Sequence, residues 1–189
     1  MFRELWRFSF ITREWTRLPV CGDTPKELAS FCAKLIGGKH MLTYGGTGFP
    51  FGQTSSNKLF VYNIETNEWK RIETENSDQN DCPTERYGQA LAIDQFNDLY
   101  IVGGTDGYHY SIDVHKFDVI TRHWRQLYHK NNNEIQEFPG ERYRHEMVFH
   151  DNKLIVFGGG TSYGCFSLEV VCLSSDSNLI YGLTQYSVQ

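Results

Sequence analysis

Residues 83–104 read PTERYGQALAIDQFNDLYIVGG, and this stretch decides the fold because its pattern occurs three times along the chain. Each copy begins with Pro-x-Glu, passes through an apolar segment and ends in two adjacent glycines. The other copies occupy residues 25–46 and 139–159. The proline precedes the first glycine by 20 residues in two copies and by 19 residues in the third. A repeat of this length with paired glycines indicates a β-propeller.

A second pattern follows each double glycine: an apolar strand, a tight turn and a tryptophan. Residues 59–69 and 114–124 both show it, and residues 5–15 hold an earlier copy at the start of the chain. The tryptophans at positions 15, 69 and 124 are therefore 54 and 55 residues apart. Each unit offers about four short strands, which is enough for one propeller blade. The predicted fold class is all-β, a propeller with about three four-stranded blades that form a partial or open arc.

The individual strands can be placed from the apolar runs. Residues 90–93 and 99–102 are predicted to be the two inner strands of one blade, and residues 145–149 and 154–157 repeat them. The last repeat departs from the pattern, because residues 171–176 replace the expected strand and turn and the tryptophan is missing. We expect the glycines to lie where neighbouring backbones approach closely. The tryptophans are interpreted as packing between blades.

The double glycine, the aromatic residue and the spaced tryptophan resemble the signature of kelch repeats over nearly the whole chain. The resemblance divides the chain into the outer strands of a first blade (1–20), two full blades (21–76 and 77–132), a partial blade (133–173) and a divergent tail (174–189). Further stretches, including residues 44–52 and 141–146, resemble the family of kelch domain-containing protein 10. That resemblance implies a six-bladed propeller.

The same resemblance implies a function. Members of this family are substrate receptors of cullin-2 RING ubiquitin ligases, whose propeller binds proteins that end in glycine and whose C-terminal box binds elongins B and C. This sequence begins inside a blade, and no leucine-rich elongin-binding helix follows its last repeat. We therefore expect a partial chain, in which the partnership with elongin B/C and cullin-2 is implied by the family alone.

Composition narrows the classes of function. The chain of 189 residues has a formal charge of −5, which argues against a nucleic-acid partner because phosphate binding requires a basic surface. Charged residues near the start argue against a secretory signal, and no apolar stretch is long enough to span a membrane. The five cysteines have no metal-type spacing, so neither a disulfide framework nor a zinc site is predicted. The predicted location is the cytoplasm, the nucleus or both, with no cofactor.

The seven histidines are scattered among strands and turns and predict no metal site. Kelch propellers include a copper oxidase, so an enzyme is one alternative. Its chemistry would need two tyrosines and two histidines around one metal ion, and the sequence does not place such a set. No catalytic residue is predicted.

Loops converge at one rim of a propeller, and the repeats place arginines and tyrosines there. Residues before the first strand of each blade and residues after the double glycine supply the predicted ligand-binding set: Arg86, Tyr87, Tyr108, Tyr110, Arg142, Tyr143, Arg144 and Tyr163. Arginine and tyrosine suit the planar anionic carboxylate of a peptide terminus. Alternatively, the arginines before the first strand tie adjacent blades together through backbone carbonyls.

The hypothesis from the sequence is a non-catalytic substrate receptor of a cullin-2 ligase that recognises C-terminal glycine. The rival class is a non-ligase kelch scaffold that docks a signalling protein. Co-purification of elongins B and C with the full-length protein separates these two classes.

Overall fold

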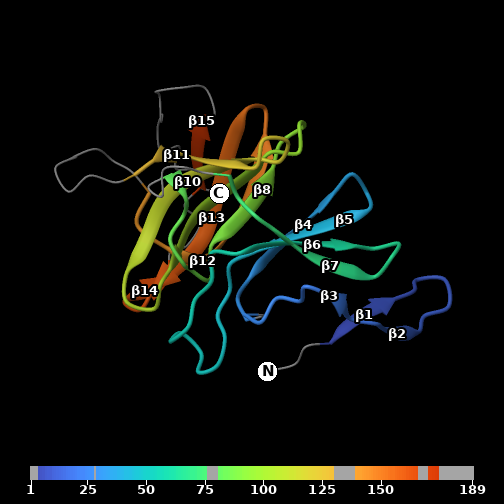
Figure 1. The fold of residues 1–189 in the computed structure, drawn as a ribbon. Helices are drawn as coiled ribbons and strands as arrows, with labels where there is room; N and C mark the ends of the chain where they lie inside the picture. Colours follow the sequence, from blue (N-terminus) through green and yellow to red (C-terminus); the bar gives the residue numbers. More distant parts are fainter. Residues whose placement is uncertain (1–3, 28, 76–80, 130–138, 166–169, 175–189) are drawn as a thin grey trace.

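The computed structural model describes residues 4–27, 29–75, 81–129, 139–165 and 170–174. The described residues form a β-hairpin and three larger sheets, whose strands are almost all antiparallel to their neighbours. Figure 1 shows the hairpin beside the first sheet, with the second and third sheets following. The predicted all-β class is thus confirmed, and the described sheets show no closure into a ring.

The N-terminal hairpin consists of β1 (Leu5–Phe8) and β2 (Trp15–Leu18). The first sheet has the order β3-β7-β6-β5-β4. Its strands are β3 (Cys21–Gly22), β4 (Cys32–Ile36), β5 (His40–Tyr44), β6 (Leu59–Asn63) and β7 (Glu68–Ile72). The two-residue strand β3 pairs in parallel with β7, and the other four strands form an antiparallel meander.

The second sheet is a four-stranded meander in the order β11-β10-β9-β8. Its strands are β8 (Ala90–Ile93), β9 (Leu99–Thr105), β10 (Tyr110–Asp118) and β11 (His123–Tyr128). The inner strands predicted at residues 90–93 and 99–102 are confirmed. The double glycine lies inside β9, which extends through both residues to Thr105.

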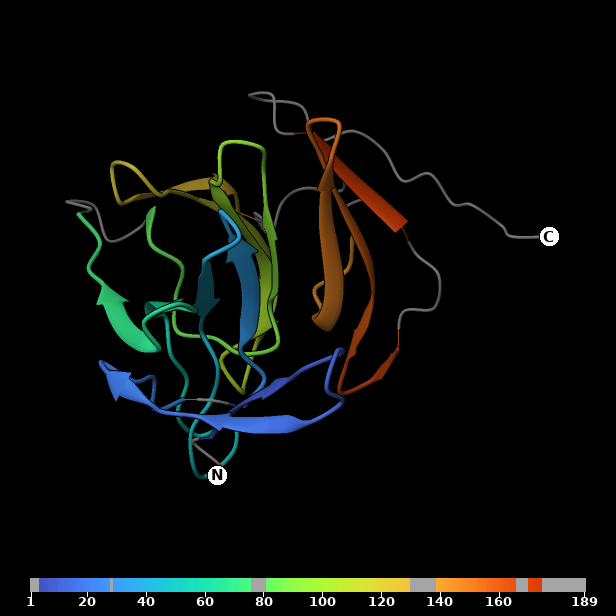
Figure 2. The same ribbon diagram turned by 90° about the vertical axis from the view of Figure 1, so that its right-hand side faces the viewer.

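The third sheet contains β12 (Tyr143–His150), β13 (Lys153–Thr161), β14 (Gly164–Cys165) and β15 (Val170–Ser174). The predicted strands at 145–149 and 154–157 lie within β12 and β13. The expectation that residues 171–176 lack the next strand is wrong, because β15 pairs with β13 along residues 153–157. A strand can form on the free edge of β13 without the aromatic residues of the other repeats, since backbone groups make the pairing. Figure 2 shows β13 and β15, in orange and red, at one side of the molecule.

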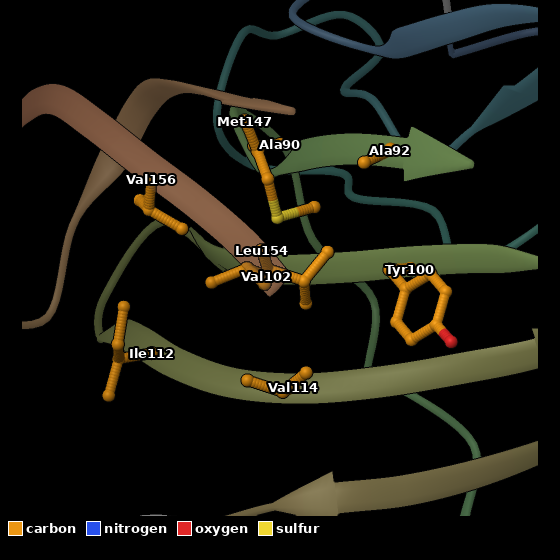
Figure 3. Close-up of a cluster of buried hydrophobic side chains, with 9 residues drawn as sticks. All are labelled: Ala90, Ala92, Tyr100, Val102, Ile112, Val114, Met147, Leu154 and Val156. Atoms are coloured by element: carbon orange, nitrogen blue, oxygen red, sulfur yellow. The ribbon is translucent and has the colours of Figure 1, made fainter. Parts of the chain in front are cut away.

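Apolar side chains pack between successive sheets. Figure 3 shows the cluster between the second and third sheets, in which Met147, Leu154 and Val156 of the third sheet meet strands of the second. Its remaining members are Ala90, Ala92, Tyr100, Val102, Ile112 and Val114. A second cluster joins the first and second sheets, and a third joins the hairpin to the first sheet. The first and second sheets therefore bury both faces against their sequence neighbours, as propeller blades do, and among the described residues the third sheet packs through one face.

The tryptophans follow this arrangement. Trp124 of β11 packs against Tyr44 of the first sheet, with ring centroids 5.4 Å apart. Trp69 of β7 belongs to the cluster shared with Leu5 and Leu18 of the hairpin. Each of these side chains faces the preceding element, which confirms the interpretation of Trp69 and Trp124 as packing residues. Trp15 of the hairpin is 66% exposed, because no described element precedes it.

The first glycines of the first two pairs, Gly45 and Gly103, lie where the following repeat approaches closely. Gly45 and Gly103 both have positive φ, at 69° and 65°. A Cβ added to Gly103 would lie 2.7 Å from Cε1 of His145, which belongs to the next sheet. A Cβ on Gly45 would meet Nε2 of Gln89 in the same way. The predicted close approach is confirmed at Gly45 and Gly103, where the side chain that fills the space comes from the following repeat, whereas a Cβ on Gly158 would meet nothing within 4 Å among the described residues.

The division of the chain at residues 20, 76, 132 and 173 stays a prediction. Apart from Ser174, the tail expected at 174–189 lies outside the described residues. No helix in the described ranges is long and apolar enough to cross a membrane.

Candidate ligand-binding rim

Three loops that follow the double glycines lie together at one rim of the sheets. The Ser55 hydroxyl donates a 3.4 Å hydrogen bond to the Asp106 carbonyl, which joins the first loop to the second. The Ser162 amide donates to the Tyr110 hydroxyl at 2.9 Å, which joins the second to the third. We call this surface the rim: loops 47–58, 105–110 and 161–164, together with residues 86–89 before β8 and residues 142–145 around the start of β12.

A threonine follows each double glycine, directly in the first two repeats and after one more glycine in the third, and it shapes the rim. The hydroxyl of Thr105 accepts from the Gly107 amide at 3.0 Å, and that of Thr161 accepts from the Tyr163 amide at 3.2 Å. Thr47 has the same role in its longer loop, where it accepts from the Gly52 amide at 3.0 Å. Side-chain bonds of this kind fix a loop in one conformation. The Gly-Gly-Thr pattern therefore holds the rim in a defined shape.

Tyrosines line the rim where the loops meet. The rings of Tyr110 and Tyr143 tilt against each other with centroids 5.3 Å apart. Tyr87 is buried and lies edge-on to Phe51, at 5.3 Å. Burial raises the pKa of Tyr87, the hydroxyls of Tyr110 and Tyr143 raise it further, and Arg144 lowers it. These side chains share one neighbourhood, as the sequence predicted for Tyr87, Tyr110, Tyr143 and Arg144.

Arg144 is the exposed cation of this group. Its guanidinium lies 5.2 Å from the centre of the Tyr143 ring, a cation–π contact. Its backbone φ of 54° lies in the left-handed region. The residues at the matching positions of the other sheets, Gly88 (65°) and Ser30 (51°), lie in the same region. The Arg144 amide donates to the Gly88 carbonyl, and the Gly88 amide to the Ser30 carbonyl. An arginine thus occupies a position where the neighbouring sheets have smaller residues.

Arg144 also borders a groove of about 330 Å³ between the beginnings of β4, β8 and β12. We call it the axial groove, because its walls are the first strands of the three sheets. Lys34 and Arg144 supply positive charge, and Glu146 supplies one carboxylate. The buried side chains Gln89 and His145 also line it, and within the described residues the Oε1 atom of Gln89 has no hydrogen-bond partner.

Arg86 and Arg142 have a different environment from Arg144. Arg142 is fully buried, and its Nη1 donates to the Gly158 carbonyl at 3.2 Å while its Nε donates to the Gly140 carbonyl at 2.9 Å. Arg86 is 3% exposed and donates to the Gly103 and Thr84 carbonyls, both at 3.0 Å. These contacts correct the expectation that the two guanidinium groups present themselves to a ligand.

The backbones of the same two arginines hold the preceding sheet. The Arg142 carbonyl accepts from the Gly104 amide at 2.9 Å, and the Arg142 amide donates to the Ser111 carbonyl at 3.1 Å. Arg86 makes the equivalent bonds with Gly46 and Ser56, both at 3.0 Å. Each arginine therefore clamps two successive sheets, as the alternative interpretation of these residues stated. Arg86 reaches only the wall of a second groove, of about 400 Å³, where its Nη2 lies 3.8 Å from Asp113.

The remaining predicted residues lie on the exposed parts of the loops. Tyr108 and Tyr163 are 83% and 97% exposed. Sequence reasoning omitted Lys34 and Gln89 from the set, although both line the axial groove. The signal for Gln89 was present, since it stands three residues after Arg86 as His145 does after Arg142.

The buried ring of His145 predicts how stability responds to pH. Burial and the nearby charge of Arg142 lower the pKa of His145 to about 4. The unfolded chain takes up a proton near pH 6.5 and the folded chain does not, so stability falls as the pH drops from about 6.5 toward 4. Between pH 7 and pH 5 we expect this histidine to cost about 2 kcal/mol.

The variant His145→Gln, which copies Gln89, should remove that part of the pH dependence in urea unfolding followed by tryptophan fluorescence. His115 is also buried with a pKa lowered to about 3, so a residual dependence should remain in the variant. An unchanged profile in His145→Gln would show that His145 does not titrate on unfolding in this range.

Among the described residues, no three His, Cys, Asp or Glu side chains gather as metal ligands would. The arrangement at the rim is that of a binding surface: an exposed cation, aromatic faces and a groove.

Comparison with known proteins places this geometry in a family. Residues 1–159 match the family model of the KLHDC2/KLHL20/DRC7 kelch-repeats domain. Kelch domain-containing protein 10 from Xenopus tropicalis is 42% identical over 171 residues, which cover 90% of this chain and 40% of that protein. The human protein of the same name is 42% identical over 171 residues, covering 90% of this chain and 37% of its own length. The homolog from Drosophila melanogaster is 36% identical over 177 residues, 89% of this chain and 28% of that protein.

The chain thus spans about 40% or less of the length of these relatives. Domains of this type are typically non-catalytic modules that bind proteins. Because the family model matches residues 1–159 and the sheets carry its repeats, the chain belongs to the KLHDC2/KLHL20/DRC7 kelch-repeat family.

Proposed function

We propose that the chain is the recognition part of a cullin-2 RING ubiquitin ligase receptor that binds proteins through a C-terminal glycine. In this proposal elongins B and C connect the whole receptor to cullin-2, and the protein acts in the cytoplasm or nucleus without a cofactor. Support for the ligase role comes from the relationship to kelch domain-containing protein 10. Support for recognition of a C-terminal glycine comes from the side chains at the rim and in the axial groove.

The observation that carries the proposal is the position of Arg144. Its guanidinium is exposed, is backed by the Tyr143 ring and borders the axial groove with Lys34. A carboxylate binds well to such a fork of donors, because two parallel hydrogen bonds match its two oxygens. The buried Arg86 and Arg142 hold this platform in place, and Arg144 makes the contact.

The axial groove also suits the rest of a peptide end. Oε1 of Gln89 has no hydrogen-bond partner among the described residues, and in this proposal a backbone amide next to the terminal carboxylate donates to it. Gly88 and Ala90 form part of the wall, so the backbone of a ligand can approach closely where it carries no side chain. Terminal glycine meets this requirement better than any other residue. The exposed rings of Tyr108 and Tyr163 are available to upstream residues.

The experiment compares two peptide libraries that differ only at the end: decapeptides ending in glycine as the free acid, and the same peptides as C-terminal amides. We expect the amides to bind at least about 30-fold more weakly, since a buried carboxylate–arginine contact contributes about 2 kcal/mol or more. Fluorescence polarisation with the strongest binders measures the loss. Equal binding of acid and amide would end the proposal of terminal recognition.

The variant Arg144→Gly locates the contact. Glycine is the residue at the matching position of the second sheet, Gly88, whose φ is 65°, so the fold should tolerate glycine at position 144. We expect Arg144→Gly to reduce binding of the free acid to the level of the amide and to leave binding of the amide unaffected. Amidation and the Arg144 substitution would each remove the same contact, so their effects should not add. The matched control is Arg13→Gly, an exposed arginine with a φ of 58° in the N-terminal hairpin. Wild-type binding by Arg144→Gly would place the carboxylate elsewhere.

A further inference from the structure

The groove of about 400 Å³ that Arg86 borders is a second candidate site at the rim. We call it the outer groove, because the start of the outer strand β10 lines it and so does His129, directly after β11. Loop 105–110 and residues before β8 and β12 complete its lining. It shares no lining residue with the axial groove, so it can hold a different part of a ligand.

The guanidinium of Arg86 brings unused hydrogen-bond donors to the outer groove. Its side chain is 3% exposed. Three of its five N–H groups donate: Nε to the Thr84 carbonyl, Nη1 to the Gly103 carbonyl and Nη2 to the Thr84 hydroxyl. The other two have no acceptor within hydrogen-bond distance among the described residues. A buried donor without an acceptor costs free energy, so these two groups favour a ligand atom that accepts.

Asp113 supplies an acceptor next to these donors. Its Oδ1 lies 3.0 Å from Nδ1 of His129, whereas its Oδ2 lies 3.8 Å from Nη2 of Arg86. The second distance is longer than a hydrogen bond, although the Asp113 side chain is only 16% exposed. A ligand group that donates to Oδ2 and accepts from Arg86 would therefore satisfy both side chains.

The charges of the outer groove select among the groups that a protein ligand can offer. A carboxylate would lie against the carboxylates of Asp106, Asp113 and Glu141. An ammonium would leave the two N–H groups of Arg86 without an acceptor. A primary carboxamide has neither defect, because its oxygen accepts and its NH₂ group donates.

We propose that the outer groove binds the side chain of a glutamine in the bound protein, with the amide oxygen on Arg86 and the amide nitrogen on Oδ2 of Asp113. Arg86 is almost fully buried, so glutamine reaches it better than the shorter asparagine does.

The position of this glutamine in the ligand rests on the proposed function. Tyr110 lines the outer groove, and its ring lies 5.3 Å from the ring of Tyr143. The Tyr143 ring in turn lies 5.2 Å from the Arg144 guanidinium. An extended chain rises about 3.3 Å per residue, so these two steps span about three residues. With the terminal glycine at Arg144, the glutamine stands about three residues before it.

Titration of the isotope-labelled full chain with capped amino acids tests the groove without any peptide terminus. The probes are the N-acetyl methylamides of glutamine, glutamate, lysine and serine, followed by NMR at the backbone amides of Asp106 and Ser111, which line the groove. We expect saturable shifts with the glutamine probe. The other three should bind at least about tenfold more weakly, because they leave a buried donor or acceptor unpaired. An equal response to all four probes, or no response to any, overturns the proposal.

The variant Asp113→Asn should change which probe is preferred. Its side-chain amide can donate where the carboxylate only accepted, so residue 113 and Arg86 would both offer donors and the glutamate probe should bind more tightly than the glutamine probe. The matched control is Asp151→Asn, which removes the same charge at an exposed turn position with a φ of 50° that asparagine adopts readily. The control should keep the original order of probes. The original order in Asp113→Asn would overturn the assigned contact.

Decapeptides ending in glycine then place the glutamine along the ligand. Glutamine is moved through the third to sixth positions from the end, with glutamate at the same positions for comparison, in free acids and in C-terminal amides. We expect the largest gain in the acids with glutamine at the fourth position. If binding needs the free carboxylate but glutamine gives no gain at any position, this inference fails and the proposed function stands. A glutamine gain of equal size in acids and amides that bind equally would support the outer groove and contradict terminal recognition.

Discussion

The variant Arg142→Ala should lose about 3 kcal/mol of stability or more. The Arg142 side chain is fully buried and donates to the Gly140 and Gly158 carbonyls. Alanine leaves these acceptors without their donor and opens a cavity between the second and third sheets. Urea unfolding followed by tryptophan fluorescence measures the loss, since Trp124 lies in the core.

Arg144 provides the matched control for this experiment, because it is two residues away and carries the same charge. Its side chain is exposed, so Arg144→Gly should keep the stability within about 1 kcal/mol of the parent. The two arginines are thus expected to separate stability from binding. If Arg142→Ala folded normally and lost peptide binding, its guanidinium would be a ligand contact and the clamp would be the wrong interpretation.

The contrast between these arginines also shows what the sequence could predict. The spacing of prolines, glycines and tryptophans located the main strands of the first two sheets and β12 and β13 of the third, because a repeat must bury the same faces each time. It also indicated the rim, since loops after the double glycine come together in any propeller. It did not separate Arg142 from Arg144. Their environments depend on the carbonyl of Gly158 and on the left-handed backbone of Arg144, and neither is visible in a pattern of residue types.

The exposure of Trp15 and the formation of β15 depend on contacts between elements, which a repeat pattern does not specify. Trp15 matches Trp69 and Trp124 in sequence but is 66% exposed, because burial requires a preceding sheet. β15 formed where the sequence pattern fails, because the edge of β13 supplies backbone partners to any extended segment. Local spacing therefore predicted strands well, whereas contacts between sheets required the structure.

The variant Gly103→Ala should be among the most damaging single changes in the chain, with a loss of about 3 kcal/mol or more. Its added Cβ would lie 2.7 Å from Cε1 of His145, 2.9 Å from the Arg142 carbonyl oxygen and 3.0 Å from the Ser111 carbonyl oxygen. Two of these atoms belong to backbone that is tied by hydrogen bonds across the sheets, so they cannot move aside without breaking the clamp. Positive φ adds about 1 kcal/mol for a residue with a Cβ. Thermal and urea unfolding measure the total.

Gly38→Ala isolates the backbone part of that loss, because Gly38 has a φ of 70° and a Cβ there would meet nothing within 4 Å. It should cost only about 1 kcal/mol, and an equal loss in Gly38→Ala and Gly103→Ala would contradict the crowding argument. Gly158→Ala extends the comparison, since Gly158 has the same φ of 70° and the same open surroundings among the described residues. It should behave like Gly38→Ala and cost far less than Gly103→Ala. The double glycine thus reports, by the cost of one methyl group, whether another sheet lies against it.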